Sequence, residues 1–152
     1  MVWAAGADDI RMILLDTKIV SEPWKPKPDP HVVAWIDAQA VETLYLSAVT
    51  VAELRFAIAA MPAGKRRQVL HERVEGDLLP VFAGRVLPFD LDASRAYAEL
   101  MSKAKTAGLA ITMADGTIAA IAAARGFLVA SRDVARFHAA GVRFINPWAA
   151  GT

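Results

Sequence analysis

Short apolar runs recur along the chain and alternate with longer amphipathic or small-residue segments. The runs predict strands over residues 12–15, 44–47, 86–89, 127–130 and 142–145. Because each run is apolar at nearly consecutive positions, we expect strands that are covered on both faces of a sheet. Pro88, in the third run, fits only a strand that lies at the sheet edge or ends there.

The segments between these runs predict helices. Asp29 and Pro30 supply an N-cap and a first helical residue, and Gly126 ends a helix that Thr112 opens. The proline-rich segment 21–30 is predicted to be a loop. The helices are expected over residues 30–39, 50–61, 65–79, from a cap at Asp92 or Ser94 to 108, 112–126, and from Asp133 to Ala140. This alternation predicts an α/β fold, a three-layer α/β/α sandwich around a central, mainly parallel sheet.

Composition narrows the class of protein. The 152 residues fit one domain with a real core, and a hydrophobic content of 55% excludes an intrinsically disordered chain. The absence of cysteine excludes disulfides, cysteine-bound zinc and thiol catalysis. A net charge of +1, taken alone, argues against a protein that coats nucleic acid.

We expect one domain over residues 12–148, with residues 1–11 a poorly ordered extension or an upstream start and residues 149–152 a short tail. The longest apolar stretches, such as residues 118–124, are far shorter than the roughly 20 residues of a membrane span. Asp8, Asp9 and Arg11 interrupt the apolar N-terminus too early for a signal peptide. The sequence therefore predicts a cytoplasmic protein with no membrane partner.

Common nucleotide-binding and hydrolase motifs are missing from the sequence. Gly64-Lys65 lacks the Ser or Thr and the leading Gly of a phosphate-binding loop, and no G-x-G-x-x-G or G-x-S-x-G motif occurs. The histidines, His31, His71 and His138, are scattered, so each is interpreted as a packing or surface residue.

Four acidic residues fall at one predicted end of the sheet. In open α/β sheets, ligands bind outside the carboxyl ends of the strands. All four acids stand in apolar stretches, where an unpaired carboxylate destabilises the fold. Asp16 follows the first strand, Glu53 lies one turn into the helix after the second, Asp115 lies in the first turn of the helix before the fourth, and Asp133 lies just beyond the fourth.

Each acid also has a purely structural interpretation. Thr50 with Glu53 fits a capping box, Thr112 stands in the same relation to Asp115, and the other two acids can cap helices. Taken one by one, these interpretations are adequate. The position of all four acids at one end of the sheet favours a shared site.

Converging carboxylates repel one another unless cations or shared protons balance their charge. Oxygen ligands without His or Cys favour Mg²⁺ or Mn²⁺ over zinc. Such an ion beside a phosphodiester can activate water and stabilise the leaving oxygen, so the acids point to metal-assisted hydrolysis of a phosphate ester. Setting four of the 16 acidic residues apart in one pocket leaves a basic excess elsewhere, which suits an RNA substrate.

The acids stand in four recognisable stretches of sequence, MILLDT at 12–17, LSAVTVAEL at 46–54, MADGTIAA at 113–120 and VASRDVARF at 129–137. Together with residues 79–90 and 145–148, these stretches resemble PIN-domain toxins of the VapC group, including its FitB-like members. The resemblance runs from Met12 to Trp148 in the same order and spacing. As a set the stretches are far more specific than any one of them.

The resemblance implies a Mg²⁺- or Mn²⁺-dependent ribonuclease that is the toxin of a type II toxin–antitoxin system. It also implies a small cognate antitoxin, whose C-terminal arm crosses the acidic cleft. A homodimer is implied as well, with operator DNA contacted only through the antitoxin.

By position, the resemblance makes Asp16, Glu53, Asp115 and Asp133 the acidic catalytic quartet. Of these, Asp16, Asp115 and Asp133 are the implied metal ligands. Their neighbours are implied to support the ligands or contact phosphate, and these are Thr17, Lys18, Ser131 and Arg132.

Lys18 departs from the family pattern, which usually has Asn at this position. An ammonium beside the site can pair with a carboxylate and weaken metal binding, or it can contact RNA phosphate. Our hypothesis is that Lys18 weakens metal binding. An alternative function follows, namely a catalytically weakened PIN-domain protein that acts mainly through antitoxin and operator-DNA complexes.

A phosphoacceptor domain and a haloacid-dehalogenase-type phosphatase also place Asp after a first strand. The former usually needs an acidic pair at that strand end, and the latter needs a second Asp where this chain has Lys18. Further candidates for phosphate contact are Lys25, Lys27 and Arg55. Trp24 can stack on a base, pack in the protein or contact the antitoxin.

Overall fold

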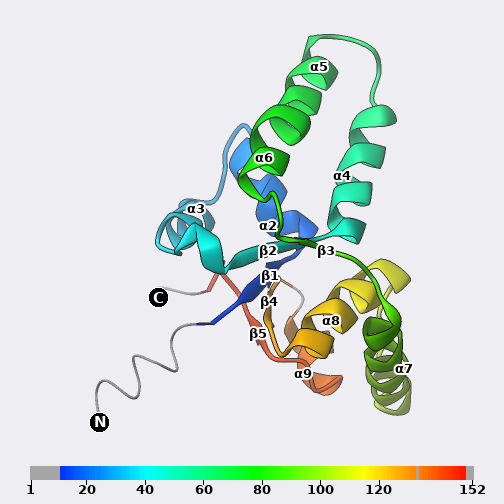
Figure 1. Cartoon of the computed structure of the whole chain (residues 1–152). Helices are drawn as coiled ribbons and strands as arrows, with labels where there is room; N and C mark the ends of the chain where they lie inside the picture. The colour runs from blue at the N-terminus through cyan, green and yellow to red at the C-terminus, as the bar shows by residue number, and fades with distance from the viewer. Residues whose placement is uncertain (1–10, 133, 150–152) are drawn as a thin grey trace.

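The computed structural model describes residues 11–132 and 134–149, which fold around a five-stranded parallel sheet (Figure 1). The strands lie in the spatial order β3-β2-β1-β4-β5. All five predicted strands are confirmed, and Pro88 follows an edge strand, as expected. The strands are β1 (Ile13–Leu15), β2 (Leu44–Ser47), β3 (Val86–Leu87), β4 (Leu128–Ala130) and β5 (Phe144–Ile145).

Alternate residues of the strands enter two separate hydrophobic cores. In β1, Leu14 packs with α7 (Leu91–Thr106), α8 (Met113–Arg125) and α9 (Val134–Ala139). Ile13 and Leu15 pack on the other face with α2 (Thr17–Ser21), α3 (Pro30–Asp37) and α4 (Ala48–Ala59). Because successive side chains of a strand point to opposite faces, both faces are apolar. The predicted three-layer α/β/α sandwich is confirmed.

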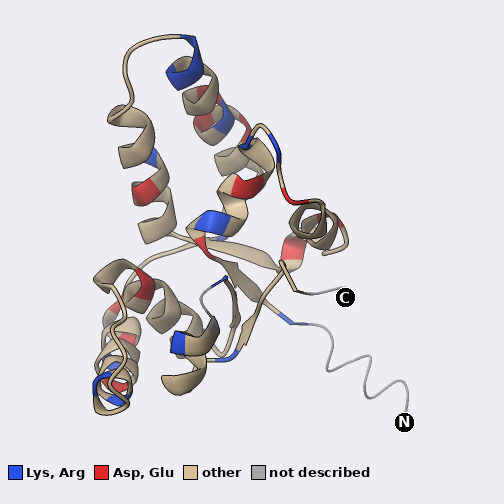
Figure 2. Ribbon diagram, turned by 180° about the vertical axis from the view of Figure 1, so that it is seen from behind, with Lys and Arg blue, Asp and Glu red and all other residues tan. Residues whose placement is uncertain are grey.

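Helices α4 and α5 (Lys65–Glu72) form an arm that extends away from the sheet (Figure 1). The chain returns toward the sheet through a π-helical stretch, η3 (Arg73–Leu78), and a short α6 (Leu79–Val81). The helix predicted over residues 65–79 is therefore present, with a wider turn in its second half. Basic residues at the start of α5 lie at the far end of the arm (Figure 2).

Two helix starts differ from the prediction. The Asp90 carboxylate, rather than Asp92 or Ser94, caps α7, since it accepts a backbone N–H three residues later at 2.9 Å. Ser47 caps α4, because its Oγ accepts the Thr50 N–H at 2.9 Å. The predicted capping box of Thr50 with Glu53 is therefore wrong, since the cap lies three residues earlier.

The segment predicted as a proline-rich loop begins with helical structure. Helix α2 runs to Ser21, and a 3₁₀ turn, η1 (Glu22–Trp24), precedes the later prolines. The Glu22 side chain is 4% exposed and lies 2.9 Å from Lys25 Nζ. Its Oε2 accepts the Asp29 N–H, and this bond, with the Lys25 contact, lowers the pKa of the Glu22 carboxyl. Trp24 packs against the core that holds α2 and α4, which confirms its packing interpretation.

Within the described part of the chain, no helix is both long and apolar enough to cross a lipid bilayer. A short 3₁₀ turn, η2 (Val41–Thr43), lies just before β2. The predicted N-terminal extension falls outside the described residues except for Arg11, and the predicted tail falls outside them beyond Ala149.

Candidate active site

Asp16 lies at the carboxyl end of the central strand. Its N–H donates to the Ala130 carbonyl at 3.0 Å, which brings Asp16 beside Ser131 at the end of β4. The carboxylate accepts the Thr17 N–H through Oδ1 at 2.6 Å and the Ser131 hydroxyl through Oδ2 at 2.9 Å. Asp16 is 7% exposed, so a buried carboxylate is held by both of its oxygens. It also caps α2, as its structural interpretation expected.

Glu53 reaches the same region from the second turn of α4. Its Oε1 accepts the Thr17 hydroxyl at 2.6 Å, and Thr17 Oγ1 lies 3.2 Å from Thr50 Oγ1. Thr17 therefore links two acids, Asp16 through its backbone and Glu53 through its side chain. A capping role cannot explain this contact, because it joins residues from different elements.

Asp115 approaches the site from the first turn of α8. Thr112 caps this helix by accepting the Asp115 N–H at 3.1 Å, so the cap predicted at Thr112 is confirmed. The Asp115 carboxylate is close enough to Asp16 for its negative charge to raise the pKa of that carboxyl. The backbone N–H of Asp115 thus takes part in the helix cap, while its carboxylate interacts electrostatically with Asp16.

Burial is the largest influence on Asp16 and raises the pKa of its carboxyl above the ordinary value. The hydrogen bonds from Ser131 and Thr17 lower it, and the negative charges of Asp115 and Glu53 raise it. The balance is a raised pKa. A carboxylate that is buried beside other carboxylates gains most from a nearby cation.

The donor chemistry of this cluster fits a hard divalent cation, since it consists of carboxylate and hydroxyl oxygens. Within residues 11–132 and 134–149, no group of three or more acidic or histidine side chains is arranged to hold a metal ion. Asp133, the fourth member of the predicted quartet, lies outside the described residues. The structure therefore brings together Asp16, Glu53 and Asp115 and says nothing about the place of Asp133.

The cations predicted near the site lie on its borders. Lys18 is exposed on α2, directly after Thr17. Arg132 follows Ser131, and its guanidinium stacks on the Trp148 ring at 5.0 Å from the ring centre. The contact with Trp148 holds the Arg132 side chain next to the end of the described chain.

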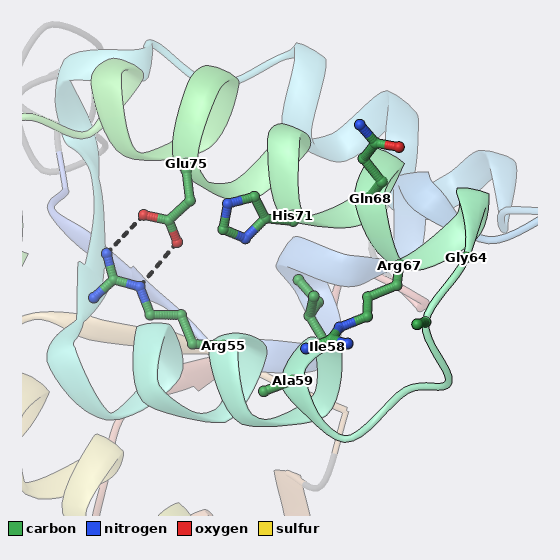
Figure 3. Close-up of a pocket in the computed structure, with 9 residues that line it drawn as sticks. Arg55, Ile58, Ala59, Gly64, Arg67, Gln68, His71 and Glu75 are labelled. Carbon is green, nitrogen blue, oxygen red and sulfur yellow. Dashed lines mark hydrogen bonds and ion pairs between the residues drawn. The ribbon is translucent and has the colours of Figure 1, made fainter.

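Arg55 is close to Glu53 in sequence but serves a different place. A cleft of 640 Å³ lies between α4 and α5, and the Arg55 guanidinium pairs there with Glu75, Nε to Oε2 at 2.9 Å and a terminal nitrogen to Oε1 at 2.8 Å (Figure 3). His71 lies on the same side of the cleft as Glu75 (Figure 3). The ion pair joins α4 to η3, and a phosphate contact by Arg55 would have to compete with Glu75 for its guanidinium.

Sequence reasoning missed Ser47 and Thr50 as members of the site. Both are 0% exposed, and Thr50 Oγ1 lies within 3.3 Å of Ser47 Oγ. The sequence does carry a signal, because Ser47, Thr50 and Glu53 follow one another at three-residue spacing, which places them on one side of a helix start.

Comparisons with known proteins identify the family of the chain. The family profile described as PIN domain matches residues 13–142. The chain is 66% identical over 137 residues to VapC ribonuclease Y4jK of Sinorhizobium fredii, covering 90% of this chain and 98% of that protein. It is 53% identical over 137 residues to Toxin FitB of Neisseria gonorrhoeae, covering 90% of this chain and 99% of that protein. A solved structure of FitAB bound to an IR36 DNA fragment has a TM-score of 0.89 at 50% identity, covering 93% of this chain and 99% of that one. The chain therefore belongs to the PIN-domain family, in the group that contains the VapC and FitB toxins.

Proposed function

We propose that this chain is a ribonuclease toxin that hydrolyses RNA phosphodiester bonds with a divalent metal ion, Mg²⁺ or Mn²⁺. The observation that carries the proposal is that Thr17 bonds both Asp16 and Glu53 at the carboxyl edge of the sheet, where Asp115 lies close enough to act on Asp16 by its charge. The name of the VapC ribonuclease relative supports the same activity.

In this proposal Asp16 and Asp115, with Asp133, hold the metal ion. The ion, when bound, supplies Lewis-acid activation of water and stabilisation of the leaving oxygen. The protein residues fix the geometry, since Ser131 and the Thr17 N–H hold both oxygens of Asp16. The Thr17 hydroxyl holds Oε1 of Glu53, which leaves Oε2 to accept a proton from an attacking water.

We further propose a small antitoxin as partner, a homodimer, operator DNA bound only through the antitoxin, and action in the cytoplasm. A structurally similar solved complex, FitAB, is bound to DNA. Exposed apolar side chains support protein partners, because a small monomer rarely leaves large apolar groups in water. Phe56, Leu91 and Met113 are 74%, 85% and 72% exposed.

RNA cleavage by the purified chain tests the activity. We expect cleavage that requires Mg²⁺ or Mn²⁺ and that falls about a hundredfold or more in both Asp16→Ala and Asp115→Ala, because each removes a carboxylate of the site. Asp92→Ala is the matched control, since the Asp92 side chain is 78% exposed on α7. Cleavage that survives both site substitutions, or that persists in a metal chelator, would contradict the proposal.

Lys18→Asn decides between the enzyme and the alternative interaction protein. We expect the substitution to raise Mg²⁺ affinity and cleavage rate about threefold to fivefold, because it removes a positive charge from the border of an acidic site. A metal titration and a rate measurement check this, with Lys105→Asn on α7 as control. Equal affinity and rate in both proteins would show that Lys18 does not weaken the site. A wild-type chain that binds antitoxin but cleaves RNA only as Lys18→Asn would favour the interaction protein.

A further inference from the structure

A row of hydroxyl groups connects the start of α4 to Glu53. Ser47 Oγ lies 3.3 Å from Thr50 Oγ1, Thr50 Oγ1 lies 3.2 Å from Thr17 Oγ1, and Thr17 Oγ1 lies 2.6 Å from Glu53 Oε1. Ser47 and Thr50 are 0% exposed. Because bulk water does not reach these two side chains, their hydrogen bonds must be made within the protein.

The number of hydroxyl protons limits which group in this row donates and which accepts each hydrogen bond. Each hydroxyl has one proton to donate, and an ionised carboxylate only accepts. The contact of 2.6 Å between Thr17 and Glu53 has the length of a charge-assisted hydrogen bond, so Thr17 gives its proton to Glu53. With its own proton on Glu53, the Thr17 oxygen is available to accept the proton of Thr50, and the Thr50 oxygen can accept the proton of Ser47.

The start of the row is consistent with this direction. Ser47 Oγ accepts the Thr50 N–H at 2.9 Å as the helix cap, which leaves its own proton for Thr50 Oγ1. In residues 11–132 and 134–149, Thr50 Oγ1 meets the hydroxyls of Ser47 and Thr17 and no carboxylate. The other hydroxyl within reach of Thr50 Oγ1 is Ser47, and a Thr50 proton donated there would displace the Ser47 proton from its contact with Thr50. A buried hydroxyl proton without an acceptor destabilises a fold, so donation from Thr50 to Thr17 is the arrangement that uses both protons.

We propose that Thr50 is a positioning residue of the acidic site, acting through Thr17 on Glu53. With the Thr50 proton on the Thr17 oxygen, the Thr17 proton is committed to Glu53 Oε1, and Oε2 is the oxygen presented to the site. The Thr17 N–H also bonds Asp16, so the residue that Thr50 contacts lies between two acids of the site. The proposal deepens the proposed function and rests on it.

Thr50→Val tests the proposal, because valine keeps the side-chain shape and removes the hydroxyl. In the full-length chain without antitoxin, we expect Mn²⁺ affinity, followed by electron paramagnetic resonance of free Mn²⁺, to fall about fivefold. The kcat for RNA cleavage should fall by a similar factor while KM stays unchanged, since buried Thr50 does not touch RNA. Thr50→Ser, which keeps the hydroxyl, should restore both values.

Two controls separate positioning from general damage. Thr43→Val removes a hydroxyl that donates to the Ala40 carbonyl at 2.6 Å, at the opposite end of β2, and should leave Mn²⁺ binding unchanged. In a Glu53→Gln background, Thr50→Val should add little further loss, because the residue through which it acts has changed. If Thr50→Val does not fold, Thr50→Cys, with a thiol as a weaker donor, takes its place in every measurement.

The outcomes distinguish this proposal from the proposed function. Thr50→Val that binds Mn²⁺ as well as Thr43→Val, or that keeps its full effect beside Glu53→Gln, overturns the role of Thr50. Mn²⁺ binding without any RNA cleavage by the wild-type chain overturns the proposed function and leaves the Thr50 measurement standing. A wild-type chain that binds no Mn²⁺ overturns both.

Discussion

Asp16→Asn is expected to make the metal-free protein more stable while it abolishes RNA cleavage. Burial raises the pKa of the Asp16 carboxyl, and Asp115 and Glu53 raise it further. An acid whose pKa is higher in the folded than in the unfolded chain stabilises the fold below its unfolded pKa. That stability is lost as the pH rises through the folded pKa. At neutral pH the ionised carboxylate therefore weakens the fold, and the neutral amide removes this effect.

The surrounding hydrogen bonds suit the amide. The Asn oxygen can accept the Thr17 N–H, and the amide NH₂ can donate to the Ser131 oxygen once that hydroxyl, which donates to Asp16 in the wild-type chain, turns its proton away. We expect the thermal midpoint in a chelator to rise by a few degrees, the shift that about 1 kcal/mol gives in a domain of this length. The gain should be largest near neutral pH and vanish in acid.

Thermal melts across this pH range, with and without Mg²⁺, check the prediction. Mg²⁺ should stabilise the wild-type chain and leave Asp16→Asn unchanged, because the variant lacks the charge that the ion would balance. Asp92→Asn serves as the control, since that exposed acid should change stability by less than about 0.5 kcal/mol. A metal-free Asp16→Asn that melts below the wild-type chain at neutral pH would contradict the account of Asp16.

The parts of the fold that depend on local chemistry are predictable from the sequence. Thr112 and Gly126 bound α8 as expected, because a hydroxyl cap and a left-handed glycine with φ of 71° act on their own neighbours. Asp90 is not distinguishable from Asp92 in this way, since both carboxylates can cap. The choice depends on where the chain leaves β3, which is a tertiary property.

Helix α2 is too short to be predicted from the periodicity of hydrophobic residues. Its five residues are too few to display a helical repeat, and it is stabilised by burial of Ile19 and Val20 in the core rather than by its own sequence. The segment from Ser21 on was predicted to be a loop because its prolines dominate the pattern. The prolines lie after the helix, where they end it.

In the candidate site, too, some residues are predictable from the sequence and others depend on the tertiary structure. The topological rule for parallel sheets places Asp16, Glu53 and Asp115 at one edge without any knowledge of side-chain contacts. Thr50 has a simpler local interpretation as a cap, and only the pairing of β1 with β2 brings it beside Thr17. Residues whose role depends on strand register are therefore beyond what one sequence predicts.

Gly116→Val is expected to damage both the fold and the site. A Cβ atom at Gly116 would lie 2.8 Å from Met101 Sδ and 3.1 Å from Tyr97 Cε2, because α7 and α8 meet closely at this glycine. Valine adds further atoms at the same point, and overpacking of this kind destabilises by about 1–3 kcal/mol. Asp115 directly precedes Gly116, so a displacement of α8 also moves this carboxylate relative to Asp16.

The comparison with Gly76→Ala isolates the helix contact. Gly76 lies in the helical stretch η3 with nothing within 4 Å of an added Cβ, so alanine there should stabilise by about 0.5–1 kcal/mol. Gly116→Ala has the same backbone advantage but meets Met101, and it should fail to stabilise. Denaturant unfolding gives the free energies, and cleavage per folded molecule should fall in Gly116→Val and stay unchanged in Gly76→Ala. If Gly116→Val kept wild-type stability and cleavage, Met101 would have to yield without moving α8, and the place of Asp115 would not depend on this contact.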